Sequence, residues 1–454
     1  MGLPKELLYL FALLLVIVIS FVFFKRPIYE SMFTGYVAMV LILKRYDVFF
    51  TYLLKPSTNT LFYAIVAFLA LAYVFSKTDV VQAIIDFLLA LVGSFRGGAG
   101  YVALFSSTFM AALSGTGPGN VAATGVFTIP AMISTKFPRH LAATVEMSAS
   151  SLGPMIPPSG TILLAFGVLE TLYPGSYSLS AFWMAVWGIG LWFILQRLIT
   201  LYLLCIKYKV EPVATEEIPE LKKVIKEDWQ ALILPLIIFI PLFLDFKLSD
   251  GFFTRRLGQA GASALSSSVI LFTPGVAALY ALFISRNRIG GLGAGNLIKL
   301  FKEGISQIIP VAATVYFAYS ISYLYGDVDM GGSLATFVEG LSMTKFQLAV
   351  FFPVFTTFLG MILPGSSQIA IFGVGIVGSL AAFGVNPLLA AALLPAITGA
   401  LEGVTPPLAL AMYAAMGIAG SGMKETSLLA MVWVLSHLAV AIVILAGFLP
   451  VLFI

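Results

Sequence analysis

Long apolar stretches, each close to the thickness of a lipid bilayer, constrain the fold of this chain more than any other feature. A transmembrane helix needs about 20 predominantly apolar residues. Only helices and closed barrels can satisfy every backbone group in lipid. We therefore expect an all-α, multi-pass membrane protein. The candidate spans are residues 7–24, 30–50, 58–76, 179–206, 229–246, 269–285, 304–325 and 428–453.

Composition excludes several classes of protein. The 454 residues are 60% hydrophobic and only 10% charged, whereas soluble domains carry roughly 25% charged residues. The net charge of +4 comes without the basic tracts that bind nucleic acid. One cysteine, Cys205, excludes a disulfide framework, and two histidines without an HExxH pattern argue against a zinc enzyme. We expect a transporter, channel or membrane scaffold that is not an enzyme and uses no cofactor.

The charged segments predict which loops face the cytoplasm. Residues 207–228 form an extended hydrophilic segment with several lysines, which favours the cytoplasmic side by the positive-inside rule. A surface helix is expected near its end, at Pro219–Asp228. From this anchor, residues 247–268 and 326–333 should face outward and residues 286–302 inward.

Two further apolar regions, 98–172 and 346–420, are interrupted where continuous helix would be expected. Each contains a cluster of small and polar residues, SGTGPGN in the first and LPGSSQ in the second, and each contains a later Pro-Pro pair. Non-helical backbone is tolerated in a membrane only where protein or a water-filled cavity satisfies it. Each region therefore predicts a re-entrant helical hairpin followed by a broken helix.

The two interrupted regions also match each other in spacing. Aligning Pro157 with Pro406 gives an offset of 249 residues (406 minus 157), which places Gly115–Gly119 opposite Pro364–Gln368. Paired broken segments in corresponding halves are the best sequence indication of a transporter site between inverted repeats. We therefore expect two inverted repeats, each with one hairpin and one broken helix.

Broken helices leave backbone groups that can bind ions. Free carbonyls can coordinate Na⁺, and exposed helix N-termini can hold an anion. The alternative is that the glycines only permit close helix packing while the polar side chains cap the broken ends. The residues alone suggest two candidate cation sites, one from Ser114, Thr116, Asn120 and the main chain at 153–156, the other from Ser366, Ser367, Gln368, Thr398 and the main chain at 403–405.

Two carboxylates lie within apolar sequence, where burial of a charge is costly. Glu146 and Glu402 could each serve as a cation ligand, a proton carrier or a protonated structural residue. Glu402 precedes Pro406 closely, in the segment predicted to be unwound. A carrier coupled to H⁺ through Glu402 is therefore an alternative to Na⁺ coupling, and an ion channel or pore that uses the same carbonyls is another. His437, in the last apolar stretch, is expected to be a packing residue.

Six short motifs occur in a characteristic order. They are SGTGPGNVAATGVFTIP at 114–130, AATVE at 142–146, SSLGPMIPPS at 150–159, LGMILP at 359–364, GVNP at 384–387 and VTPP at 404–407. Together they resemble the large membrane subunit of TRAP (tripartite ATP-independent periplasmic) transporters, which belong to the ion-transporter superfamily. The resemblance covers roughly residues 60–454 and is closest to the branch with fused subunits, often served by TAXI-type binding proteins.

The resemblance implies an elevator-type importer of a small organic acid such as a carboxylate, driven by Na⁺ in the inner membrane. A periplasmic binding protein would deliver substrate, and a small four-helix membrane subunit would be a separate chain or missing. The implied parts are N-terminal scaffold helices at 1–97, the first half of the transport domain at 98–172, further scaffold at 173–345, the second half of the transport domain at 346–420 and a C-terminal helix at 421–454.

The resemblance also implies site residues by motif position. Three positions depart from the family pattern, namely Pro118 in the first tip, the PGSSQ sequence of the second tip and Glu402, so the cation ligands and the coupling ion stay open. The implied first sodium site consists of Ser114, Gly115, Asn120, Gly153, Met155 and Ile156. The implied second sodium site consists of Gly360, Pro364, Gly365, Thr398, Gly403 and Thr405. The implied substrate site lies between the two hairpin tips and consists of Thr116, Gly117, Asn120, Ser366, Ser367 and Gln368.

Overall fold

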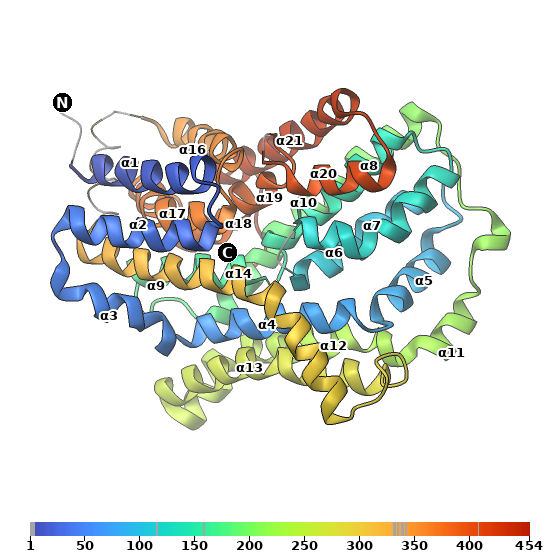
Figure 1. The fold of residues 1–454 in the computed structure, drawn as a ribbon, viewed down its shortest axis with the longest axis horizontal. Coiled ribbons are helices and arrows are strands. Elements are labelled where there is room, and N and C mark those ends of the chain that lie inside the picture. Colours follow the sequence, from blue (N-terminus) through green and yellow to red (C-terminus); the bar gives the residue numbers. More distant parts are fainter. Residues whose placement is uncertain are drawn as a thin grey trace.

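The computed structural model is helical throughout the part of the chain that it describes. Within that part no strand occurs (Figure 1). Six of the described helices are long and apolar enough to cross a membrane, and two bent helix pairs would bring the number to eight. The expected all-α, multi-pass fold is confirmed. The described residues are 5–114, 117–157, 159–329, 333, 336, 340, 343–406 and 408–454.

Short apolar helices form the N-terminal part of the chain. α4 contacts both α13 and α14, whereas α2 packs against α1 and α14. α5 was not among the expected spans, because its apolar sequence extends over only 13 residues. The elements are α1 (Lys5–Val18), which continues into the π-helix η1 (Ile19–Phe23), α2 (Ile28–Leu43), η2 (Tyr46–Val48), α3 (Phe49–Leu54), η3 (Lys55–Thr58), α4 (Thr60–Ser76) and α5 (Val80–Val92).

The first interrupted region folds as a hairpin and a broken helix. The hairpin arms α6 and α7 pack against each other and against α8. The chain then leaves the helix at a segment rich in Gly and Pro, and α9 begins where the Ser159 hydroxyl accepts a hydrogen bond from the Thr161 N–H at 3.3 Å. The elements are α6 (Gly98–Ser114), α7 (Gly117–Ser134), α8 (Arg139–Ser150), η4 (Gly153–Met155) and α9 (Gly160–Leu172).

The second interrupted region repeats this pattern. Its hairpin starts at a capping box, in which the side chains and backbones of Thr344 and Gln347 bond reciprocally. At the offset of 249 residues Gly117, the first residue of α7, corresponds to Ser366, the second residue of α17. The two predicted repeats are confirmed as elements of the fold. Those of the second half are α16 (Lys345–Gly360), α17 (Gly365–Ala382), α18 (Pro387–Ile397), α19 (Gly399–Glu402) and α20 (Leu410–Ala419).

The halves are interleaved. The hairpin arm α7 of the first half packs against α20 of the second, and α17 of the second half packs against α9 of the first. In Figure 1, α18 and α19 lie near the centre, with α1–α3 at one edge and α5 and α11 at the other. Most residues of α8, α18 and α19 are buried, so these parts of the broken helices are covered by the surrounding helices.

Longer helices complete the bundle. α11 is the expected surface helix, with a mostly exposed polar face and buried Val224 and Ala231. α13 and α14 begin well before the apolar stretches 269–285 and 304–325 that predicted them. The remaining elements are α10 (Leu179–Tyr208), η5 (Thr215–Glu217), α11 (Leu221–Leu232), α12 (Leu234–Leu248), the π-helix η6 (Ser249–Phe253), α13 (Thr254–Ile284), α14 (Ala294–Asp327) and α21 (Met423–Leu445).

Three span boundaries expected from the sequence are wrong. The stretch 30–50 is divided, because Lys44 adopts a left-handed φ of 55° and ends α2. The stretch 229–246 is divided by a 52° bend, which separates the helical segment Thr215–Leu232 from α12. The stretch 428–453 is not helical to its end, since α21 stops shortly before Gly447, whose φ is +86°.

Candidate functional site

Glycines bring the two breaks and the second hairpin into direct contact. A Cβ added to Gly399, in the second break, would lie 2.8 Å from the Cβ of Pro154 in the first break. Gly365, at the start of α17, lies against Gly399 so closely that no side chain would fit there. Gly153 likewise packs against the backbone of Ala111 in α6. Residues far apart in the sequence thus meet at one point.

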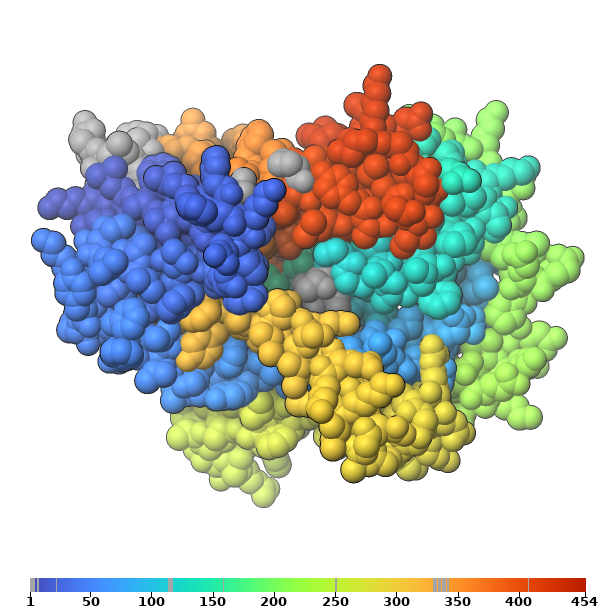
Figure 2. All heavy atoms as spheres, viewed as in Figure 1, coloured from blue at the N-terminus to red at the C-terminus, as the bar shows by residue number. Residues whose placement is uncertain are grey.

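A cavity of about 250 Å³ lies beside this point, between the two hairpins. Pro118 of the first hairpin and Ser366 of the second line it, and α4 and α14 close its other side. Figure 2 shows the surface hollowed near the centre, between α14 in yellow and the C-terminal elements in red. The lining residues are Ile28, Ile65, Phe68, Leu69, Pro118, Gly160, Thr161, Pro310, Val311, Thr314, Val315, Pro364, Ser366, Gly399, Glu402 and Leu410.

Glu402 is the one ionisable residue among those that line this cavity. It ends the short helix α19, and its carboxylate accepts a hydrogen bond from the backbone N–H of Gly365, the first residue of α17. A helix N-terminus carries partial positive charge, so a carboxylate is stabilised there. Gly360 is close as well, since a Cβ added to it would lie 3.4 Å from the Glu402 Cα. The second break is thus joined to both arms of the second hairpin.

The predicted residues of the second half lie near one another around this junction. Gln368 is buried and donates to the Leu363 carbonyl at 3.0 Å, while its side-chain oxygen has no hydrogen-bond partner. The Ser367 hydroxyl is also buried without a partner. Thr398 and Thr405 donate to the carbonyls one turn earlier, at 2.8 and 2.9 Å, which leaves their hydroxyl lone pairs available to a ligand.

The carbonyl of Gly403 is engaged by the protein itself. It accepts a hydrogen bond from the Met412 N–H at 3.0 Å. A Cβ added to Gly403 would lie 3.1 Å from the Ala411 Cβ, and one added to Gly117 at the first tip would lie 3.2 Å from the same atom. The first tip and the second break therefore share contacts with the start of α20.

In the first half, a buried carboxylate is surrounded by hydroxyl groups. Glu146 on α8 is fully buried. Ser107, Thr124 and Thr128 on the hairpin donate to it at 2.7, 2.6 and 2.6 Å, and Ser150 donates at 3.3 Å. Among the described residues Glu146 has no ion-pair partner. These bonds tie both arms of the first hairpin to α8.

Asn120 connects this network to the tip of the first hairpin. Its amide nitrogen donates to the Ser107 carbonyl at 3.0 Å and to the Ser150 hydroxyl at 2.8 Å, while its side-chain oxygen is buried without a partner. Asn120 also lines a second cavity next to the first. It thus resembles Gln368 in the other half, where an amide likewise donates to main chain and keeps a free oxygen.

Three other residues predicted in the first half, Gly153, Met155 and Ile156, lie in the first break. Met155 and Ile156 lie towards α10, where the Ile156 side chain is close to Gly190. Gly153 faces α6, as described above. The remaining predictions, namely the side chain of Ser114 and the whole of Gly115 and Thr116, fall outside the described residues.

Neighbouring cavities extend from the junction towards a basic surface. The 250 Å³ cavity between the hairpins shares Leu69 and Val311 with the one that Asn120 lines. That cavity shares Ser76 and Gln307 with another of about 480 Å³. The cavity of about 480 Å³ shares Arg288 with a fourth cavity, of about 340 Å³. The lining of this fourth cavity includes Lys77, Arg288, Lys299 and Glu303.

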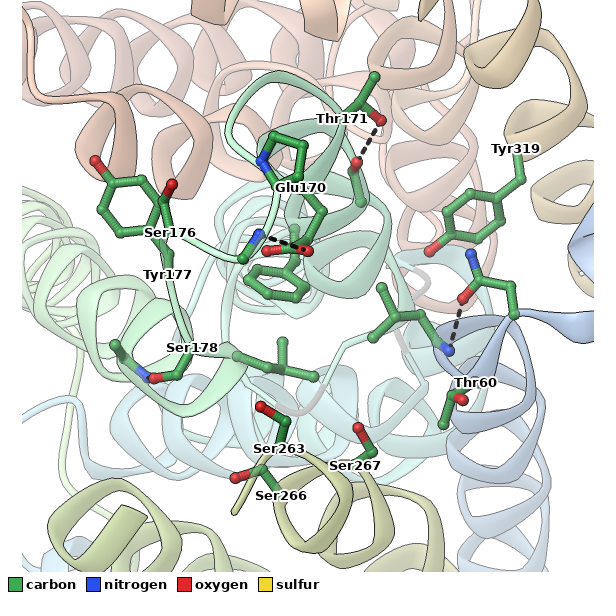
Figure 3. Close-up of a pocket in the computed structure, with 18 of the residues that line it drawn as sticks. Thr60, Glu170, Thr171, Ser176, Tyr177, Ser178, Ser263, Ser266, Ser267 and Tyr319 are labelled. Carbon is green, nitrogen blue, oxygen red and sulfur yellow. Dashed lines mark hydrogen bonds between the residues drawn. The ribbon is translucent and has the colours of Figure 1, made fainter. Parts of the chain in front are cut away.

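A larger cavity of about 860 Å³ shares no lining residue with these four. In Figure 3, hydroxyl groups of Ser263, Ser266 and Ser267 on α13 lie on one side of it and Tyr319 on another. Glu170 accepts a hydrogen bond from the Gly175 N–H at 3.5 Å beside it. This polar cavity is separate from the junction of the hairpins.

A buried charge on α10 escaped the sequence analysis. Arg197 lies in the middle of the apolar stretch 179–206 and hydrogen-bonds with His437 at 2.9 Å. The signal was present, because a lone arginine in a long apolar stretch is as costly as a carboxylate. His437 is buried and hydrogen-bonded through both ring nitrogens, in keeping with the packing role expected for it.

The arrangement of two hairpins and two broken helices around a cavity is matched by the comparisons with known proteins. Residues 7–452 match the family model of the tripartite ATP-independent periplasmic transporter, DctM component. The chain belongs to this family. The expected resemblance to the large subunit of TRAP transporters is therefore confirmed, and the chain is a transporter subunit rather than an enzyme.

Named relatives are similar over most of the chain. The sialic acid TRAP transporter large permease protein SiaM of Vibrio cholerae is 23% identical, over 77% of this chain and 75% of its own length. The C4-dicarboxylate TRAP transporter large permease protein DctM of Pseudomonas aeruginosa is 24% identical, over 86% of this chain and 85% of its own length. The isethionate permease protein DctMQ of Oleidesulfovibrio alaskensis is 22% identical, and this chain matches 51% of its length.

Two solved structures share the fold. MtrF of Neisseria gonorrhoeae, described as an antimetabolite efflux pump, has a TM-score of 0.64 at 14% identity, over 91% of this chain and 87% of MtrF. The YdaH transporter of Alcanivorax borkumensis has a TM-score of 0.61 at 17% identity, over 88% of each chain. At this level of identity the likeness concerns the fold alone.

Proposed function

We propose that this chain is the large membrane subunit of a secondary importer that carries a small organic acid into the cell with a Na⁺ gradient. The observation that carries the proposal is the cavity of about 250 Å³ between the two hairpins, lined from both halves of the repeat. A site between inverted repeats, formed by broken helices, is typical of secondary transporters. The relatives named above carry sialic acid, C4-dicarboxylates or isethionate, all of which are organic acids.

The free oxygens around the junction support Na⁺ as the coupling ion. The side-chain oxygens of Asn120 and Gln368 are buried without hydrogen-bond partners, one in each half. A buried oxygen without a partner costs free energy unless a ligand satisfies it. Hard cations such as Na⁺ prefer oxygen ligands, and unwound carbonyls in transporters coordinate Na⁺. Each half thus offers one amide oxygen to a cation site.

The proposed movement is of the elevator type. Residues 98–172 and 346–420 would form the moving transport domain, and residues 1–97 and 173–345 most of the scaffold. One wall of the cavity comes from the two hairpins and broken helices, the other from α4 and α14. Movement of the first wall along the second would expose the cavity to each side of the inner membrane in turn.

Two further proteins complete the proposed system. A periplasmic binding protein would deliver the organic acid, and a small four-helix membrane subunit would support the scaffold in the lipid bilayer. The lining of the cavity of about 860 Å³ includes residues between 249 and 267 and at 326–327, in segments expected to face outward. It is therefore on the side from which a binding protein would approach.

Uptake into proteoliposomes tests the proposal. The purified chain, with its small subunit and binding protein, should accumulate radiolabelled organic acid when an inward Na⁺ gradient is imposed. Ser366→Ala, in the cavity wall, should reduce uptake, whereas Ser268→Ala, on the exposed surface of α13, should not. Uptake that ignored both Na⁺ and H⁺ gradients would contradict a secondary transporter.

Coupling to H⁺ is a second candidate, favoured by the position of Glu402. The cavity lining includes this carboxyl group and no basic residue. An organic anion and an ionised Glu402 would repel each other there, so a protonated Glu402 would favour binding of the anion. Under this mechanism Glu402→Gln would bind substrate but lose uptake driven by an H⁺ gradient. Unchanged H⁺-driven uptake by Glu402→Gln would exclude it.

A further inference from the structure

A buried arginine lies between the two broken helices, outside the cavities described above. Arg197 on α10 is only 1% exposed. Among the described residues it forms no ion pair with a carboxylate. A charge buried at this depth is costly unless other interactions compensate it. Its hydrogen bonds identify those interactions.

One set of bonds leads to the first break. The Nη2 atom of Arg197 donates to the hydroxyl of Ser151 at 3.2 Å, and this hydroxyl donates to the Ser148 carbonyl at 2.7 Å. Ser151 is the residue that follows α8. The guanidinium group therefore lies at the C-terminal end of α8, where the helix dipole carries partial negative charge.

A second set of bonds leads to the second break. The Nη1 atom of Arg197 lies 2.9 Å from Nδ1 of His437, and Nε2 of this ring lies 2.9 Å from the Ala396 carbonyl. A carbonyl only accepts, so Nε2 carries the hydrogen and Nδ1 accepts from Arg197. Ala396 is the penultimate residue of α18, whose last carbonyls have no partner within the helix. The neutral imidazole thus links the same guanidinium group to the end of α18.

Side chains of α10 and α21 hold this cluster in place. The His437 ring lies over the Phe193 ring, with a centroid separation of 4.2 Å and an interplanar angle of 31°. Gln196 accepts from Arg197 and donates to Ser436 on α21 at 2.6 Å. His437 is therefore held by Phe193 on α10, and Arg197 by Gln196, which is itself bonded to Ser436 on α21.

We propose that Arg197 is a positioning residue that, through Ser151 and His437, holds the C-terminal ends of α8 and α18 at a fixed separation. Its charge is balanced by two helix ends, one from each repeat, instead of by a carboxylate. Gly153 and Thr398, both candidate cation ligands, lie two residues beyond Ser151 and Ala396, respectively. The Arg197–His437 pair therefore sets the geometry of the two breaks at which Na⁺ would bind. Its effect on Na⁺ rests on the proposed function, but its effect on the two breaks does not.

Hydrogen–deuterium exchange of the purified full-length chain tests the positioning directly. Arg197→Gln should speed exchange by about tenfold in peptides that cover both breaks, 148–157 and 394–405, since a tenfold change in opening corresponds to the loss of a single good hydrogen bond. Ser151→Ala should affect the first peptide alone and His437→Phe the second alone. Faster exchange throughout the chain in every variant, or unchanged exchange at the breaks, would overturn the proposal.

A rescue variant and a transport measurement separate positioning from simple support of the fold. His437→Gln keeps one donor and one acceptor at this position. Unlike His437→Phe, it should therefore leave exchange at the second break at the wild-type rate. In uptake assays Arg197→Gln should raise the half-saturating Na⁺ concentration by about tenfold and change the half-saturating concentration of loaded binding protein far less. An unchanged Na⁺ requirement despite faster exchange would refute the link to cation binding. If wild-type uptake does not respond to Na⁺, the proposed function fails, while the exchange results still decide the positioning role.

Discussion

Gly399 packs against Pro154 so closely that a Cβ on the glycine would come within 2.8 Å of the proline Cβ. These residues are 245 positions apart (399 minus 154) and belong to the breaks of different repeats. The two breaks are therefore in direct contact at this point. Any residue larger than glycine at this point must push the halves apart.

Gly399→Ala should therefore destabilise the protein. Overpacking of a tight contact costs roughly 1–3 kcal/mol, and thermal unfolding in detergent would report the loss as a lower Tm. Gly417→Ala on α20 is the matched control, because nothing lies within 4 Å of the added Cβ. A control as destabilising as Gly399→Ala would show that the close contact is not the cause.

A substitution of Gln368 should weaken cation binding more than it lowers the stability of the protein. Gln368→Met removes the free side-chain oxygen and the bond to Leu363, so the half-saturating Na⁺ concentration should rise by about tenfold. Thr356→Val, in the other arm of the same hairpin, removes a buried hydrogen bond to the Phe352 carbonyl. Thr356 lines none of the cavities described above, so this variant should leave that concentration unchanged. The two variants are compared by uptake at varied Na⁺ and by Tm. Equal Na⁺ requirements in both would assign Gln368 a structural role.

Glu146 can be tested for a structural role against a role in coupling. Glu146→Ala leaves four hydroxyl groups without their acceptor and should cost roughly 1–3 kcal/mol or more. Glu146→Gln keeps an acceptor, and Thr124 and Thr128 each also lie within hydrogen-bond distance of a carbonyl in α7. Glu146→Gln should therefore retain most of the stability, measured by thermal unfolding.

The same Glu146→Gln variant then separates the roles in transport. If Glu146 only ties the hairpin to α8, uptake by a stable Glu146→Gln should keep its dependence on Na⁺ and on pH. If Glu146 binds the cation or carries the proton, a stable variant should lose the gradient dependence. We expect the first result, because Glu146 is enclosed by its hydrogen bonds and lines none of the five cavities.

The breaks could be predicted from the sequence because their cause is local. Proline lacks an N–H and clashes with the preceding turn. Pro157 and Pro406 each begin a Pro-Pro pair a few residues after a glycine, a combination that favours a break, whereas single prolines such as Pro130 lie inside helices. The spacing of the two prolines, together with the glycines nearby, was enough to predict both hairpins and their correspondence. The positions of the individual cation and substrate ligands stay predictions, since they depend on how backbone and side chains turn at each break.

Features that depend on tertiary contacts were not predictable in this way. The left-handed turn at Lys44 carries no Gly or Pro to announce it. Arg197 was visible as a lone charge, but Ser151 and His437, its partners outside α10, come from two other segments of the chain. The cavity beside Glu402 likewise requires the docking of both hairpins on α4 and α14. Contacts of this kind join segments that are far apart in the sequence, so no pattern within a single segment predicts them.

The series of cavities predicts which residues face each side of the membrane. Ala123 lines two of the cavities that lead to Lys77 and Arg288, whereas Ser263 lines the separate cavity of about 860 Å³. Residues 286–302 are expected to be cytoplasmic and residues 247–268 external. An impermeant maleimide should therefore label Ala123→Cys from the cytoplasmic side and Ser263→Cys from the external side.

The chain provides a clean background for this experiment, because its one cysteine, Cys205, is buried. Ala143→Cys, fully buried in α8, is the control that should react from neither side. Labelling is measured by mass shift in inside-out and right-side-out vesicles. Reaction of Ala123→Cys from the external side alone would contradict this prediction. It would mean either that the orientation of the chain in the membrane is the opposite of the one expected, or that the cavities between α7 and α14 open outward. Loss of its cytoplasmic labelling on addition of substrate and Na⁺ would show that the same cavities close during transport, as alternating access requires.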